Sequence, residues 1–163
     1  MKLAEFNKGV ELIKDFLDSE YRNKNFSIAP TTTDNFDKFV AETEANGYMT
    51  ISLEGCENTI YKTDDCSGVF YNILARVWHD THHLNSHLGF SANDEKIVCD
   101  LQIQEFLDWC IDNNLGDEYK SDVSNAIKII KADIVGQLEY YDKFKQFVPI
   151  QINFILEYLG VER

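Results

Sequence analysis

Helical periodicity runs through the carboxy-terminal two thirds of the chain and constrains its fold more than any other feature of the sequence. From about Asp65 onward, apolar residues recur at steps of three and four almost to the end. Three places interrupt this pattern: Gly89, residues 114–116 and Pro149. Between the last two, residues 118–145 predict one long helix with a continuous apolar seam. The seam consists of Val123, Ile127, Ile130, Ile134, Leu138 and Tyr141. The sequence therefore predicts a helical bundle over most of its length.

The amino-terminal third predicts two helices and a small sheet. Residues 3–21 have the apolar spacing of an amphipathic helix. A shorter helix is expected after the capping residues 33–34, ending at 46–47, an Asn-Gly pair that suits a left-handed C-cap. Apolar and polar residues alternate over 49–53, and 59–61 are expected to return as the partner strand of a hairpin. The predicted fold class is therefore α+β, mostly α-helical: a helical bundle with a small N-terminal β-hairpin.

The amino-acid composition is typical of one ordinary domain with an acidic surface. The chain has 163 residues, of which 44% are hydrophobic, so it can bury a full core without a disulfide or a structural metal. No repeat or linker divides it, and we expect a single domain over residues 1–163. Fifteen basic against 28 acidic residues leave a net charge of -13, which repels phosphate backbones and argues against direct binding of nucleic acid.

The cellular location is predicted from the lack of a membrane span and of a signal peptide in the sequence. No apolar run reaches the roughly 18 residues of a membrane span, and the amino terminus shows no signal-peptide pattern. The four cysteines form no CxxC pair. Cys99 and Cys110 are expected on one helix, about 16 Å apart, which is too far for a disulfide. Buried free thiols in a cytoplasmic protein are the simplest interpretation, with a bridge between Cys56 and Cys66 as the alternative.

The four histidines of the chain all fall within residues 79–87. If residues 67–88 form one helix, His79 and His83 project side by side, because they are one turn apart, and Asp80 lies close to them. Two imidazoles at positions i and i+4 can bind one metal ion. A helical face rarely supplies a full ligand set, so a third ligand is expected from another element.

Glu95 is the first candidate for that third ligand. Ser91 is a plausible N-cap for the next helix, and the short connection over 88–90 would fold that helix back beside the histidines. Glu95 lies on a largely apolar face, where a carboxylate needs a partner. The face consists of Glu95, Val98, Gln102, Phe106 and Trp109.

Two histidines and one carboxylate predict a metal site with open coordination positions. Ligands His79, His83 and Glu95 fit a hydrolytic Zn or a non-haem Fe. Asp80 is the candidate catalytic residue, as general base, with a role as ligand or as an orienting neighbour left open.

Three interpretations without a metal compete with this one. The histidines can belong to a solvated surface helix on which Asp80 pairs with Arg76, four residues earlier. They can also form a buried, metal-free hydrogen-bonded network. Glu95 on its own is explained by the preference of helix amino termini for negative charge.

Residues 79–83, HDTHH, contain HDxxH, which resembles the HExxH helix of zinc metalloproteases with aspartate in place of the glutamate base. Aspartate is one methylene shorter, so a base placed by that geometry would not reach the metal-bound water. The His79-Asp80 pair is also similar to the centre of the HD phosphohydrolase helix. That family uses a histidine, a His-Asp pair and a later aspartate as metal ligands and cleaves phosphate esters. Asp100 or Asp122 corresponds to the late aspartate, but the chain has no histidine before residue 79.

The same segment, followed by Phe90-Ser91 and Glu95, resembles a pattern found in small uncharacterised bacteriophage proteins: HDxxH, a Phe-Ser turn and an acidic residue. The resemblance covers about twenty residues. It implies a viral origin, with the host cytoplasm as the place of action, and a combined site of His79, Asp80, His83 and Glu95. No activity follows from it.

Two functions from different classes remain at this stage. The first is a metal-dependent hydrolase acting on a small neutral or enclosed substrate, because the acidic surface does not attract anions. The alternative is a non-catalytic acidic protein that docks on a basic host protein or blocks a nucleic-acid-binding surface. Glycine-rich phosphate loops, GxSxG elbows and nucleophilic cysteine motifs are absent from the sequence, which disfavours kinases, serine hydrolases and thiol enzymes.

Overall fold

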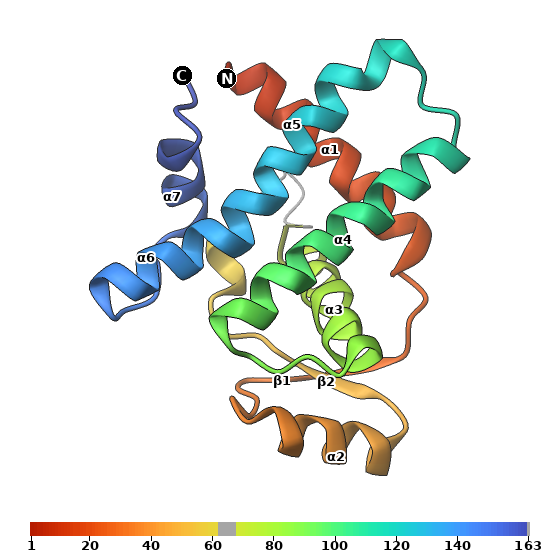
Figure 1. The fold of residues 1–163 in the computed structure, drawn as a ribbon, viewed down its shortest axis with the longest axis vertical. Coiled ribbons are helices and arrows are strands. Elements are labelled where there is room, and N and C mark those ends of the chain that lie inside the picture. The colour runs from red at the N-terminus through yellow and green to blue at the C-terminus, as the bar shows by residue number, and fades with distance from the viewer. Residues whose placement is uncertain (62–67, 163) are drawn as a thin grey trace.

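A computed structural model describes residues 1–61 and 68–162, and it is mostly helical with one small sheet (Figure 1). This confirms the predicted α+β, mostly α-helical class, but not the predicted pairing of its strands. The longer helices are α1 (Leu3–Glu20), α3 (Gly68–Ser86), α4 (Ala92–Asp112) and α5 (Lys120–Lys131). The shorter elements are β1 (Phe26–Ala29), α2 (Phe36–Asn46), β2 (Met49–Ser52), α6 (Gln137–Phe144), α7 (Gln151–Tyr158), the 3₁₀ turns η1 (Cys56–Asn58) and η2 (Asp117–Tyr119), and the π-helical turn η3 (Ala132–Gly136).

Helix ends follow the capping residues expected from the sequence, with one difference. The Ser91 side chain caps α4 by accepting a hydrogen bond from the backbone N–H of Asp94. Gly47 ends α2 at φ +74°, in the left-handed conformation. The cap of α2 is Asn35, whose side chain accepts from the N–H of Lys38, so the helix begins slightly later than the predicted capping residues 33–34.

The predicted hairpin is wrong, because β2 pairs in parallel with β1 across the helix α2. Phe26 lies opposite Met49, and the hydroxyls of Ser27 and Thr50 are 2.8 Å apart. Residues 59–61 form no strand; the neighbouring residues Ile60 and Tyr61 are both buried, whereas a half-buried strand alternates. In place of strand pairing, the N–H of Ile60 donates to the Gln151 side chain.

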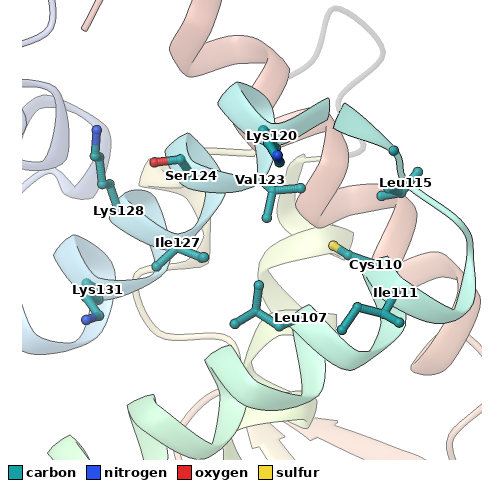
Figure 2. Close-up of a pocket in the computed structure, with 11 residues that line it drawn as sticks. Leu107, Cys110, Ile111, Leu115, Lys120, Val123, Ser124, Ile127, Lys128 and Lys131 are labelled. Atoms are coloured by element: carbon teal, nitrogen blue, oxygen red, sulfur yellow. The ribbon is translucent and has the colours of Figure 1, made fainter. Parts of the chain in front are cut away.

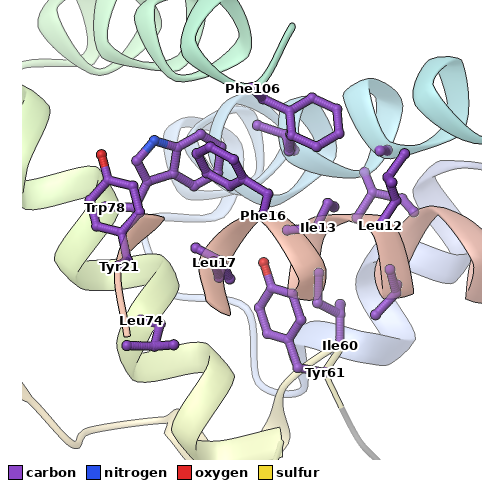
Figure 3. Packing of buried hydrophobic residues seen from close by; sticks show 14 of the residues in the cluster. Leu12, Ile13, Phe16, Leu17, Tyr21, Ile60, Tyr61, Leu74, Trp78 and Phe106 are labelled. Atoms are coloured by element: carbon purple, nitrogen blue, oxygen red, sulfur yellow. The ribbon is translucent and has the colours of Figure 1, made fainter. Parts of the chain in front are cut away.

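The core is centred on Phe16 of α1 (Figure 3). Its ring makes edge contacts with Trp78 of α3 and with Phe106 of α4, at centroid distances of 4.8 and 5.6 Å. On its other side α1 packs tightly against α5 at Gly9, where a Cβ atom would lie 2.9 Å from Ile129. These contacts hold α3 and α4 in the relative position that builds the site below.

The helical run predicted over 118–145 is present but not uniform. Helix α5 continues into η3 and then α6, and the wider π turn adds a residue that rotates the buried face. Ile130 of the predicted seam is therefore buried, whereas Tyr141 is 41% exposed. After α7, the chain returns to α1, where the N–H of Leu3 donates to the carbonyl of Glu162, and the two termini lie side by side (Figure 1).

In the described part of the chain, no helix is both long enough and apolar enough to span a bilayer. Cys99 and Cys110 both lie on α4, as predicted. The expected helix start near Asp65 and the alternative bridge between Cys56 and Cys66 involve residues outside those described.

Candidate metal centre

Helices α3 and α4 bring the three predicted ligands together. His79 and His83 lie one turn apart on α3, with ring centroids separated by 4.6 Å. The chain then turns back within residues 87–91, so the first turn of α4 places Glu95 against both rings. One donor atom from each residue lies within 4.8 Å of the other two.

Separations between these donor atoms match those of ligands on one ion. The two Nε2 atoms are 3.0 Å apart, Glu95 Oε2 is 3.0 Å from His79 Nε2, and Glu95 Oε1 is 3.4 Å from His83 Nε2. Metal–ligand bonds of about 2.1 Å give ligand–ligand distances of about 3.4 Å in a tetrahedron and about 3.0 Å in an octahedron. The donor set and its spacing therefore fit a transition-metal ion.

Both imidazoles are oriented through their Nδ1 atoms. His83 Nδ1 lies 3.0 Å from the carbonyl oxygen of Leu88, which only accepts hydrogen bonds, so Nδ1 carries the proton. His79 Nδ1 lies 3.0 Å from Gln102 Oε1. With Nδ1 protonated, the neutral rings direct bare Nε2 lone pairs toward each other and toward the Glu95 carboxylate. Three electron-rich groups in contact require a cation between them, either a proton or a metal ion.

Without a metal, a proton on His79 supplies the positive charge of the cluster. Burial by itself lowers the pKa of His79, but the hydrogen bond and charge of Glu95 outweigh it and raise that pKa to about 9. Burial likewise raises the pKa of Glu95, and the two histidines outweigh this effect and bring it to about 2. The metal-free site is therefore an imidazolium–carboxylate cluster.

The site is buried on the His83 side and open on the His79 side. The His83 side chain is fully buried, whereas that of His79 is 24% exposed and that of Glu95 is 15% exposed. Phe90 lies edge-on to His83 at a centroid distance of 5.0 Å, and Phe36 of α2 packs on Phe90 at 5.5 Å. The complete burial of His83 contradicts the solvated surface helix as an account of this residue.

Asp80 lies beside the cluster without belonging to its donor set. Burial raises its pKa, while the electrostatic interaction with His79 and His83 acts in the opposite direction. The pair with Arg76, which the surface-helix alternative implied, does not form: the Arg76 guanidinium donates to the backbone carbonyls of Ser52 and Glu54, at 2.7 and 2.6 Å. The role of Asp80 as general base stays a prediction.

The other two histidines have separate surroundings. His82 Nε2 lies 2.7 Å from Glu105, which also accepts hydrogen bonds from Trp78 and Tyr21, so this carboxylate ties α1, α3 and α4 together. His87 follows α3 with φ +52° and is exposed. Neither contributes a donor atom to the cluster.

Sequence reasoning missed the groups that orient the imidazoles. The carbonyl of Leu88 carries no side-chain signal. Gln102 shares a face of α4 with Glu95 and is almost completely buried. A polar residue on a predicted apolar face is the sequence signal that would have assigned it a partner. Comparisons of the chain with known protein families, with curated proteins and with solved structures find no match.

Proposed function

We propose that this protein binds one divalent transition-metal ion, Zn or Fe, through His79, His83 and Glu95, and uses it as a metal-dependent hydrolase. The observation that carries the proposal is the convergence of three donor groups, two of which are imidazoles whose Nδ1 atoms already contact Gln102 and Leu88. Two histidines and a carboxylate leave coordination positions open for water and substrate.

The surrounding residues supply the other functions that hydrolysis needs. When bound, a metal ion of this kind lowers the pKa of a coordinated water and polarises a carbonyl or phosphoryl oxygen. The Asp80 carboxylate, close enough to be affected by the charges of both histidines, is proposed to accept the proton of the attacking water. The open side at His79 is the route for substrate, and the wall formed by Phe36 and Phe90 excludes water from His83.

A small neutral ester or amide is the substrate class favoured by charge, because a chain with a net charge of -13 repels anions. We further propose the cytoplasm as the working compartment. The free, buried thiols of Cys99 and Cys110 on α4 support this location.

Metal analysis of protein purified without a histidine tag or chelator tests the site before any substrate is known. Wild type should contain near-stoichiometric Zn or Fe, and His79→Ala and Glu95→Gln should lose it while their circular dichroism stays helical. His87→Asn is the matched control, since it removes an exposed histidine outside the cluster and asparagine tolerates a positive φ. Metal-free wild type that also gains no thermal stability from added Zn²⁺ or Fe²⁺ would refute the metal site.

Hydrolysis is tested separately on metal-loaded protein with p-nitrophenyl acetate, a neutral ester, and bis-p-nitrophenyl phosphate, an anionic diester. The neutral ester should be cleaved faster, and Asp80→Asn should lower kcat without lowering the metal content. Rates equal to those of free metal in buffer would leave a metal-binding protein and remove the hydrolase.

A further inference from the structure

A second feature lies away from the metal centre: an apolar groove between the carboxy-terminal half of α4 and α5, with a volume of about 460 Å³ (Figure 2). It begins at Leu107, twelve residues after Glu95 and therefore about 18 Å along α4. Six residues form its apolar lining: Leu107, Cys110, Ile111, Leu115, Val123 and Ile127. The groove is therefore a separate site from the proposed metal centre.

The lining is accessible. Ile111 is 71% exposed at the edge of the groove, and Leu107, Val123 and Ile127 are only partly buried by their neighbours. Figure 2 shows side chains from both helices directed into the space between them. A continuous apolar groove of this kind marks a binding surface more often than scattered apolar residues do.

Charge distinguishes this groove from the rest of the molecule. Lys120, Lys128 and Lys131 of α5 border it, in a chain that carries 28 acidic and only 15 basic residues. Lys120 forms a 2.6 Å pair with Asp117, but both side chains are almost fully exposed, so the pair competes weakly with a ligand. Within the described residues, Lys128 and Lys131 form no ion pair.

We propose that this groove binds an acidic amphipathic helix of a partner protein. The three lysines extend over the twelve residues of α5, a rise of about 16 Å, which matches a row of acidic side chains along a helix of three turns. A single carboxylate, as in a fatty acid, would engage one end of that row only. Apolar side chains at positions i, i+4 and i+7 of the bound helix fill the groove, and acidic side chains on its flank pair with the lysines.

A display library tests the chemistry of the partner. The library presents a 14-residue amphipathic helix with leucine at the groove-facing positions and Asp, Glu, Lys, Arg or Ser at the flanking ones. Clones are selected on wild-type protein and then counter-selected on Ile111→Gln, which removes the apolar side chain at the exposed edge of the groove without changing its charge, so that the counter-selection does not itself favour acidic flanks. Clones that survive should carry an excess of Asp and Glu, although the net charge of the whole protein favours basic peptides.

Binding of the selected peptides, measured by fluorescence anisotropy, then locates the site. The double variant Lys128→Glu/Lys131→Glu should weaken binding about tenfold or more. Lys38→Glu reverses the charge of an exposed lysine on α2, at the far end of the molecule, and as the control for charge reversal at a distance it should leave binding unchanged (Figure 1). The proposal would be overturned if the surviving clones had neutral or basic flanks, or if Lys38→Glu weakened peptide binding as much as the double variant. Binding of dodecanoate in place of the peptides would overturn it as well.

Discussion

The backbone carbonyl of Leu88 accepts a hydrogen bond from Nδ1 of His83 across 3.0 Å, just after α3 ends. This bond fixes which imidazole nitrogen carries the proton, and it does so with a group that cannot change its role. The Gln102 side chain lies at the same distance from Nδ1 of His79, but its amide can both accept and donate and the residue can be altered by mutation. The two orienting contacts therefore differ in how directly mutation can test them.

Gln102→Ala should weaken metal binding about 10–100-fold while leaving all three ligands in place. The reason is that His79 loses the acceptor that holds its ring in the ligating tautomer. Competition with a chelator of known affinity measures the change. Gln104→Ala, two residues away and exposed, is the control and should bind metal like wild type. Equal affinities of wild type and Gln102→Ala would show that this contact does not orient the ligand.

Added Zn²⁺ should stabilise the folded protein, because the ligands converge only in the native state. At a free concentration 100 times the Kd, the gain is about 2.7 kcal/mol, or a rise of about 5–10 °C in Tm for a domain of this size. Differential scanning fluorimetry of chelator-treated protein measures the shift. Glu95→Gln, which keeps the shape of the side chain, should show little of it. An equal shift in this variant would place the bound Zn²⁺ elsewhere.

The predictable part of the site rests on local rules. His79 and His83 face the same way because they are one turn apart, and Glu95 follows because the Ser91 cap starts α4 after a very short connection. Whether these residues hold a metal stays a prediction.

The parts that the sequence did not predict depend on tertiary contacts. Strand β2 pairs with β1, which lies before α2 in the chain. The residues of β1, Phe26–Ala29, alternate only weakly between apolar and polar, so the sequence favours a local hairpin over this more distant pairing. The π turn at Ala132–Gly136 likewise has no residue pattern that distinguishes it from an α-helix. Because the turn rotates the buried face of the helix, the later residues of the predicted apolar seam no longer face the core.

Gly9→Ala should destabilise the protein by about 1–3 kcal/mol. The added methyl group would lie 2.9 Å from the Ile129 side chain and 3.0 Å from the backbone nitrogen of Ala126, and a backbone atom cannot rotate away. Urea unfolding followed by circular dichroism measures the loss. Gly9 lies inside a helix, where alanine is intrinsically favoured by up to about 1 kcal/mol, so a stabilised variant would show that α1 and α5 are less closely packed than the structure indicates.

Asp133→Asn should stabilise the protein at pH 8 and have little effect at pH 4. Asp133 Oδ1 accepts hydrogen bonds from Gln137 and Gln151, and burial raises its pKa to about 6 against their opposing influence. The pKa of Asp133 is thus about 6 in the folded state, against an ordinary value of 3.8, so the folded state binds the proton more tightly than the unfolded state.

Stability at this position is consequently highest at low pH and is lost as the pH rises from about 4 to 6, by up to about 3 kcal/mol. Asparagine keeps the accepting oxygen for both glutamines and removes the buried charge. Unfolding by urea at pH 4 and pH 8, with a chelator present, gives the difference between wild type and variant, in which the titration of groups that do not interact with Asp133 cancels. A variant that is less stable at pH 8 than at pH 4, relative to wild type, would mean that the ionised Asp133 carboxylate stabilises the junction of α5 and α6.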